Sequence, residues 1–83
     1  MTYNIDFTGI SGKEALHDYL TDALCLPDYY GRNLDALYDC LTEFPECEII
    51  ITDTGTLDEY IALIMDVFSE AAEDNPNIHL FFI

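Results

Sequence analysis

The sequence predicts a small two-layer α/β domain, in which helices pack on a three-stranded parallel sheet. The chain has 83 residues, the length of a single domain. Short alternating or β-branched apolar segments take turns along it with longer segments whose apolar residues recur at helical spacing. Strands separated by helices need crossover connections, so we expect the strands to be parallel and the crossovers right-handed.

The first strand and the first helix follow from local patterns. Residues 2–7, TYNIDF, alternate strictly between apolar and polar side chains, which predicts a strand with one covered face. The segment Ser11-Gly-Lys-Glu14 has the pattern of a capping box and predicts the start of a helix that Pro27 stops.

The second helix is predicted over residues 34–43, because Asn33 is a favourable N-cap and Pro45 follows. The β-branched run Ile49-Ile50-Ile51 is too short for a helix. It predicts a strand that is buried on both faces, as strands of parallel sheets usually are.

The last third of the chain predicts one long helix and a final strand. Thr56-Leu-Asp-Glu59 has the pattern of a second capping box, and an apolar stripe at helical spacing continues from it to about residue 73. The residues 74–77 predict a turn, and the apolar residues 78–83 predict the third strand.

The charge balance excludes several classes of partner. Seventeen acids against two bases, Lys13 and Arg32, give a net charge of −15. Nucleic acids and anionic membranes need a basic face, so direct binding to either is not expected. A basic protein partner fits, because a strong field of one sign steers a surface of opposite sign into contact. The first ten residues lack the pattern of a secretory signal, and no apolar run has the length of a membrane span.

The three cysteines indicate neither a closed disulfide set nor a metal site. Cys25, Cys40 and Cys47 are odd in number and lack the C-x-x-C spacing of zinc or iron–sulfur proteins. We expect reduced thiols packed as small hydrophobic side chains in a cytoplasmic protein without a cofactor.

The predicted second helix has one apolar and one acidic face. At 100° per residue its leucines face the core, Tyr38 lies at the border of that face, and Asp35, Asp39, Thr42 and Glu43 face solvent. No lysine or arginine balances these acids within the helix. Two interpretations stay open, a solvated face in a chain that is poor in bases and a surface that binds a basic partner.

The loop before this helix favours a binding surface. Tyr29 and Tyr30 directly precede Gly31 in a loop that begins with a proline. We expect one tyrosine to join the core and Tyr29 to be the exposed one. Exposed tyrosine beside acids is a composition typical of protein interfaces.

Residues 26–42, LPDYYGRNLDALYDCLT, resemble the conserved block of the barstar family, intracellular inhibitors of barnase-type secreted ribonucleases. The resemblance extends in element order over nearly the whole chain. It implies a three-stranded parallel sheet with helices on one side. It also implies an immunity protein, or antitoxin, that is a monomer when free and covers the active site of a basic ribonuclease in a 1:1 complex.

The resemblance also implies a set of contact residues. Asp39 would occupy the ribonuclease pocket that binds an RNA phosphate. The other contact positions would be Tyr29, Gly31, Asn33, Leu34, Asp35, Tyr38, Thr42 and, more distantly, Glu70. The chain departs from well-known members at several positions, among them Tyr38 for tryptophan, Glu43-Phe44 for Gly-Trp and Arg32 for an acid. These departures leave the identity of the target open.

Other functions fit the sequence less well. An enzyme would need an acid–base pair such as Asp35 with Asp39 or Asp58 with Glu59, but no pocket or Cys/His pairing is indicated. His17 is expected on a helix flank and His79 in the last strand.

An acyl carrier would need a serine in an attachment context, and neither serine has one. Calcium binding by residues 53–58 lacks the alternating oxygen ligands of a calcium loop. An acidic module that neutralises a different basic toxin or partner is the remaining alternative.

Overall fold

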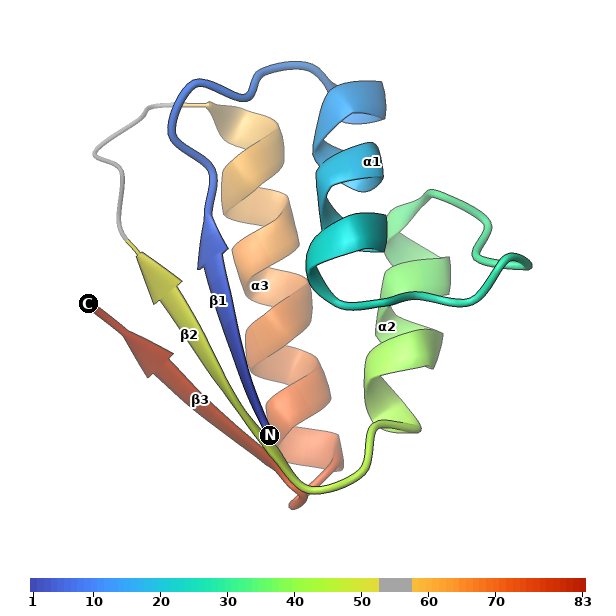
Figure 1. The fold of residues 1–83 in the computed structure, drawn as a ribbon, viewed down its shortest axis with the longest axis vertical. Coiled ribbons are helices and arrows are strands. Elements are labelled where there is room, and N and C mark those ends of the chain that lie inside the picture. The colour runs from blue at the N-terminus through green and yellow to red at the C-terminus, as the bar shows by residue number, and fades with distance from the viewer. Residues whose placement is uncertain (53–57) are drawn as a thin grey trace.

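The computed structural model describes residues 1–52 and 58–83. Three strands and three helices follow one another along these residues (Figure 1). Their order is β1 (Thr2–Asp6), α1 (Lys13–Ala23), α2 (Leu34–Thr42), β2 (Cys47–Thr52), α3 (Glu59–Asp74) and β3 (Ile78–Phe82).

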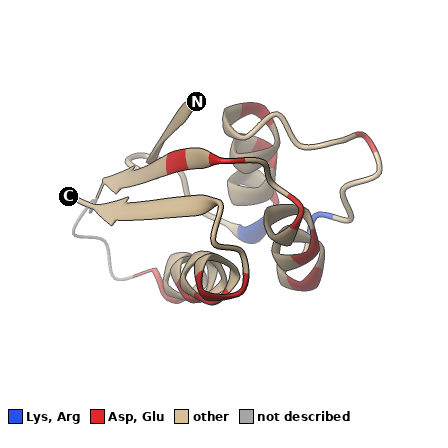
Figure 2. Cartoon of the chain, turned by 90° about the horizontal axis from the view of Figure 1, so that it is seen from below, with Lys and Arg blue, Asp and Glu red and all other residues tan. Residues whose placement is uncertain are grey.

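The three strands form one parallel sheet, as predicted, and their order in it is β1-β2-β3. The register places Ile5 beside Ile51 and Ile49 beside Leu80. All three helices lie on the same side of the sheet (Figures 1 and 2). The two-layer α/β fold expected from the sequence is therefore confirmed.

The core lies between the inner face of the sheet and the helices. Ile5, Ile49 and Ile51 are fully buried there against Leu37 of α2 and Phe68 of α3. Because each of these side chains removes its apolar surface from water, each contributes about 1.5–3 kcal/mol to folding.

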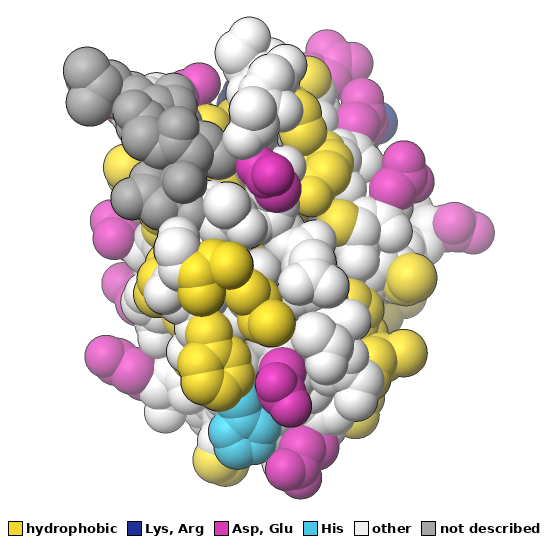
Figure 3. All heavy atoms as spheres, turned by 60° about the vertical axis from the view of Figure 1, so that its left-hand side comes forward, with side chains coloured by type: hydrophobic (Ala, Val, Ile, Leu, Met, Phe, Trp, Pro, Cys, Tyr) yellow, Lys and Arg dark blue, Asp and Glu magenta, His cyan; other side chains and the backbone are white. Residues whose placement is uncertain are grey.

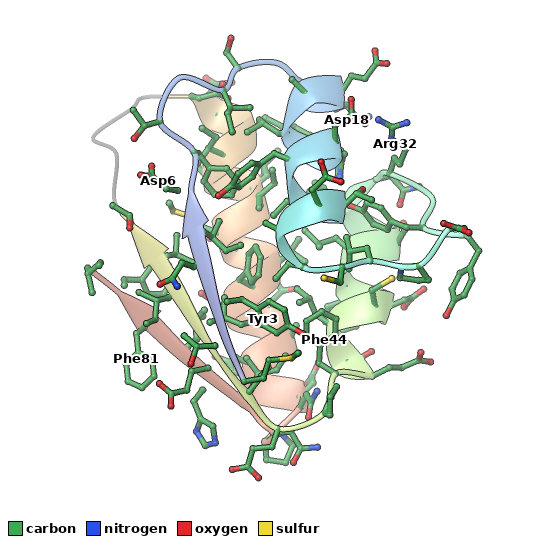
Figure 4. All side chains as sticks on the ribbon, viewed as in Figure 1. Tyr3, Asp6, Asp18, Arg32, Phe44 and Phe81 are labelled. Carbon is green, nitrogen blue, oxygen red and sulfur yellow. The ribbon has the colours of Figure 1, made fainter. Side chains whose placement is uncertain are left out.

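The prediction that β2 is buried on both faces is wrong. Cys47, Ile49 and Ile51 are buried, but Glu48 is exposed and Ile50 is only partly covered. The reason is that the helices occupy a single side, which leaves the outer face of the sheet to solvent. Apolar side chains therefore remain visible on this face (Figure 3), where Phe81 is 48% exposed. Figure 4 shows Phe81 pointing away from the helices.

The starts of two helices differ from the predicted capping boxes. The N-cap of α1 is Gly12, with φ of 93°, and no side chain caps it. The Ser11–Glu14 box is therefore wrong, because Gly12 takes the N-cap position with a positive φ that glycine adopts readily, and the helix starts at Lys13. Thr56 of the second box lies outside the described residues. Residues 53–57, which belong to the segment considered for calcium binding, lie outside them as well. The described N-cap of α3 is Asp58, whose carboxylate accepts hydrogen bonds from the Tyr60 and Ile61 amides.

His17 is buried in the core, so the prediction that it lies on a helix flank is wrong. Its Nδ1 lies 2.5 Å from the Tyr30 hydroxyl and its Nε2 lies 2.6 Å from the Tyr60 hydroxyl. These two partners satisfy both ring nitrogens and join α1 to the loop before α2 and to α3. Burial is the main cause that lowers the pKa of His17, with the charges of Lys13 and Arg32 adding to it. Burial also raises the pKa of Tyr30, which keeps its hydroxyl protonated.

The lowered pKa of His17 predicts a loss of stability in mild acid. The unfolded chain takes up a proton at about pH 6.5, whereas the folded protein resists it until a lower pH. The free energy of unfolding should therefore be insensitive to this group above that pH. It should fall as the pH drops below about 6.5, by at most about 1.4 kcal/mol per pH unit.

Chemical denaturation between pH 7.5 and 5 measures this slope, with His79→Gln in the exposed part of β3 as the control variant. His17→Gln should flatten the slope. NMR titration of the wild-type protein gives an independent reading. An imidazole of His17 that becomes charged at its ordinary pH in the folded state would contradict this account.

The cysteines are free, but only Cys47 is fully packed as predicted. Cys40 is partly buried and Cys25 is exposed, so the expectation of three packed thiols is wrong for Cys25. Cys25 has a positive φ of 54° because it follows the C-cap of α1, where the chain reverses. The side chain of a residue in that reversal points outward.

Candidate functional site

The loop before α2 is shaped by backbone hydrogen bonds. The Leu26 amide donates to the Thr21 carbonyl at 3.0 Å, which closes the end of α1 around Cys25. The Tyr30 amide donates to the Pro27 carbonyl at 2.9 Å, which closes a turn. Tyr29 lies inside this turn and is 81% exposed, whereas Tyr30 is 7% exposed. The prediction that Tyr29 is the exposed tyrosine is therefore confirmed.

The start of α2 is fixed by Asn33, as predicted. Its side-chain oxygen accepts a hydrogen bond of 2.8 Å from the Ala36 amide, and its side-chain nitrogen donates to the Gly31 carbonyl. A Cβ at Gly31 would lie 3.2 Å from the side-chain nitrogen of Asn33 and 3.3 Å from the Ala36 Cβ. Glycine thus lets the loop pass close to the helix cap.

Replacing Asn33 by alanine should weaken this junction. The Asn33→Ala variant should lose about 0.5–2 kcal/mol of stability, because the Ala36 amide in the first turn of α2 loses its hydrogen-bond acceptor. Thermal or urea unfolding measures the loss. The Asn33→Asp variant, which keeps a capping oxygen, is the control and should stay within a few tenths of a kcal/mol of the wild type. Equal losses in both variants would mean that the cap is unimportant.

Helix α2 packs against α3 and presents its opposite face to solvent. Leu37 and Leu41 are buried on the inner face, and Asp35, Asp39 and Glu43 are exposed on the outer one. This division confirms the two faces predicted from the spacing. Thr42 lies at the border, and its hydroxyl donates to the Asp39 carbonyl at 2.8 Å.

Tyr38 connects the acidic face to α3. Its hydroxyl donates a short hydrogen bond to the Asp74 carboxylate. This bond, together with the negative charges of Asp74, Glu70 and Asp39, raises the pKa of Tyr38. Glu70 of α3 therefore lies near enough to Tyr38 for its charge to act on that hydroxyl. Local spacing in the sequence does not predict the contact of Asp74 with Tyr38, because the two residues are 36 positions apart.

Two hollows flank the outer face of α2. One, of about 350 Å³, lies at the start of the helix and is lined by Lys13, Asn33, Leu34, Asp35 and Tyr60. The other, of about 240 Å³, lies between the loop and the second half of the helix and is lined by Cys25, Pro27, Tyr29, Cys40, Glu43 and Phe44. Tyr29 and Leu34 thus border concave surfaces into which side chains of a partner could fit.

Phe44 also has a structural role. Its ring centroid lies 5.7 Å from that of Tyr3 on β1 (Figure 4), so it ties the end of α2 to the sheet. The departure from tryptophan at this position therefore affects packing as well as the rim of the hollow.

No ion pair between described residues neutralises the acidic face. Among residues 1–52 and 58–83, the ion pairs are Arg32 with Asp18 and His79 with Glu46. Neither involves the carboxylates of Asp35 or Asp39. Acidic segments are spread over the chain in Figure 2, and the two basic ones stand close together.

The described residues contain no group of three His, Cys, Asp or Glu side chains that is arranged to hold a metal ion. None of the helices in this part of the chain combines the length and the apolar character needed to cross a membrane.

Comparison with known proteins gives a clear assignment. Residues 1–83 match the model of the family described as "Barstar (barnase inhibitor)". The chain belongs to the barstar family. It is also 40% identical to the "Putative ribonuclease inhibitor YrdF" of Bacillus subtilis (strain 168), over 76 residues that cover 84% of this chain and 84% of that protein.

Membership of the barstar family confirms the resemblance seen in residues 26–42. Barstar proteins are inhibitors rather than enzymes, so the interpretation of this chain as a non-enzyme is confirmed as well. The carboxylate pairs that were weighed as catalytic acids and bases are, in the barstar fold, parts of an exposed helix and of a helix cap.

Proposed function

We propose that this protein inhibits a basic, secreted ribonuclease of the barnase type by covering its active site with α2 and the preceding loop. The proposal rests on the family assignment and on the name of the Bacillus subtilis relative. The observation that carries it is the acidic face of α2, which forms no ion pair with the described part of the chain. Asp35 and Asp39 lie one helical turn apart, both exposed, beside a loop that exposes Tyr29.

An acidic face of this kind suits the inhibition of a ribonuclease. A ribonuclease binds RNA phosphates through cationic side chains, and a carboxylate is the closest protein counterpart of a phosphate oxygen pair. Hydrogen bonds between a carboxylate and arginine or lysine are roughly twice as strong as neutral ones, and arginine binds both oxygens at once. In this proposal Asp39 takes the place of a phosphate and Asp35 supports it one turn earlier.

The other proposed contacts surround these two carboxylates. Tyr29 supplies a large rigid side chain, and Gly31, where a missing Cβ lets the loop pass close to Asn33 and Ala36, is a further proposed contact. Asn33 holds the loop to the helix, so its contribution is both structural and interfacial. The remaining proposed contacts are Leu34, Tyr38, Thr42 and, from α3, Glu70.

The proposal places the protein in the cytoplasm, where an inhibitor protects the cell from its own ribonuclease before secretion. Three free cysteines suit a reducing compartment. We expect a monomer when free and a 1:1 complex with the target.

The test is inhibition and association measured with barnase and related purified ribonucleases. Inhibition should be stoichiometric, and the association rate should fall steeply as salt rises, because screening reduces the reach of the field to about 8 Å near physiological ionic strength. The dissociation rate should change much less. A folded protein that inhibits no ribonuclease of this type, or an association rate indifferent to salt, would contradict the proposal.

A further inference from the structure

The only two cations in the sequence lie at one place on the surface. Lys13 is the first residue of α1, and Arg32 directly precedes the N-cap of α2. Together with Glu14 they line a hollow of about 360 Å³. Lys13 also lines the neighbouring hollow that contains Asn33, Leu34 and Asp35. The two cations therefore adjoin the start of the acidic face.

Neither cation is firmly engaged within the protein. Arg32 pairs with Asp18 (Figure 4), but the two side chains are 47% and 60% exposed. Such exposed pairs contribute only about 0–1 kcal/mol, so Arg32 is able to exchange Asp18 for another carboxylate. The Lys13 ammonium lies 5.8 Å from the centre of the Tyr60 ring and has no ion-pair partner among the described residues.

Two cations at this position change which partners fit. The net charge of −15 attracts every basic surface, and attraction of this kind selects poorly among basic proteins. Specificity requires a difference in affinity, and like charges that face each other supply one. A partner that is basic throughout would meet Lys13 and Arg32 with repulsion. A partner with a carboxylate at the matching position would gain an ion pair.

We propose that Lys13 and Arg32 form a receptor for an acidic side chain of the ribonuclease, beside the acidic face of α2, and that this receptor selects the target. The inference rests on the proposed function and adds a requirement to it. The target has a basic active site, and it carries an aspartate or glutamate at the rim that meets the starts of α1 and α2.

The first experiment measures the Kd of four proteins for a panel of purified barnase-type ribonucleases that includes barnase. The proteins are the wild type, Arg32→Glu, Lys13→Glu and a control with Thr2→Glu and Asn4→Glu. The control makes the same change of formal charge on the outer face of β1, where both side chains are exposed. Thermal melts check that each variant is folded.

The reversals should change the order of affinities across the panel. The member that binds the wild type most tightly should lose about tenfold with Arg32→Glu, and members without the matching carboxylate should gain. The control should shift all members by one common factor, since it acts only through the long-range field. Reversals that act like the control would overturn the receptor and leave the inhibitor proposal intact.

A double-mutant cycle on the tightest member then locates the carboxylate. Each acidic residue of the ribonuclease is replaced by alanine and tested against the wild type and Arg32→Ala. One position should be coupled to Arg32 by about fivefold or more. If no position is coupled while Asp39→Asn still weakens inhibition strongly, the receptor is refuted and the ribonuclease function stands. If the folded wild type binds no member, both proposals fail.

Discussion

Asp39→Asn should weaken inhibition of the target ribonuclease by about 30-fold to several thousandfold, with no loss of stability in the free protein. The binding loss corresponds to about 2–5 kcal/mol, which is the range for removing one partner of a buried charge pair at an interface. The barnase–barstar complex is itself one of the systems from which this range comes. The variant keeps the size of the side chain, so packing changes little. Inhibition assays and thermal melts of the same preparation measure both effects.

The free protein should tolerate this change because Asp39 has no stabilising contact to lose. Within the described residues its carboxylate has no hydrogen-bond or ion-pair partner. It lies one turn after Asp35, a like charge that destabilises the helix by roughly 0.2–0.5 kcal/mol. It also lies in the half of α2 where the helix dipole disfavours a negative charge.

Asp35→Asn is the matched control for stability. Asp35 lies in the first turn of α2, where a negative charge is favourable by about 0.3–1 kcal/mol. Loss of this charge should therefore lower stability slightly, whereas loss of the Asp39 charge should leave it equal or slightly higher. If Asp39→Asn melts several degrees lower and inhibits normally, Asp39 is a structural residue and the proposed site is wrong.

Asn75→Ala should destabilise the protein by about 2–4 kcal/mol, the largest effect we expect from a polar residue. Asn75 is 5% exposed, and its side-chain nitrogen donates to the Leu41 carbonyl at 3.0 Å and the Phe44 carbonyl at 3.1 Å. Its side-chain oxygen accepts from the Asn77 amide. The side-chain amide of Asn75, at the end of α3, thus provides hydrogen-bond donors for two backbone carbonyls at the end of α2. The midpoint temperature should fall by about 4–8 °C for each kcal/mol.

Two further variants separate the hydrogen bonds from the loss of volume. Asn75→Asp keeps the shape but presents an acceptor, instead of a donor, to the two carbonyls, so it should destabilise at least as much at neutral pH. Acidification should restore part of its stability relative to the wild type. Asn77→Ala, an exposed neighbour, should stay within about 0.5 kcal/mol of the wild type. A mild effect of Asn75→Asp would mean that the cavity, and not the donor, explains the loss in Asn75→Ala.

Most of the fold could be predicted from the sequence because its signals are local. The alternation in residues 2–7, the cap at Asn33 and the stripe that buries Ile61, Ile64 and Phe68 each depend on neighbours within a few residues. The start of α1 was missed although its signal is also local. Ser11 and Gly12 compete for the same position, and the positive φ at Gly12 decides the outcome.

The remaining errors involve partners that are distant in the sequence. A histidine beside Leu16 and Leu20 is buried only if hydroxyl groups reach it, and those of Tyr30 and Tyr60 come from 13 and 43 residues away. Asn75 reaches Leu41 across 34 residues. Local spacing contains no information about such contacts, and it could not show that one side of the sheet stays open.

In the candidate site, too, the features that depend on local sequence could be predicted and those that depend on distant contacts could not. The exposure of Tyr29, Asp35 and Asp39 followed from helical spacing and turn residues, and the structure confirms it. Their contact with a ribonuclease comes from the family resemblance and stays a prediction. The convergence of Lys13 and Arg32 depends on how α1 and α2 pack, which no local pattern encodes.

The open outer face of the sheet has a consequence for how the protein behaves in concentrated solution. Parallel strands with uncovered apolar side chains and free backbone edges are surfaces on which copies of a chain associate. At neutral pH the net charge of −15 keeps copies apart. Near the isoelectric point of 4.1 this repulsion disappears, whereas Phe81 and the edge of β3 stay exposed. We expect light scattering to rise sharply near pH 4 and to vanish when the pH is returned to 7, and flat scattering would refute this. The acidic residues proposed to attract a ribonuclease would then have a second role. Their repulsion would prevent aggregation of a domain whose sheet is covered on one side only.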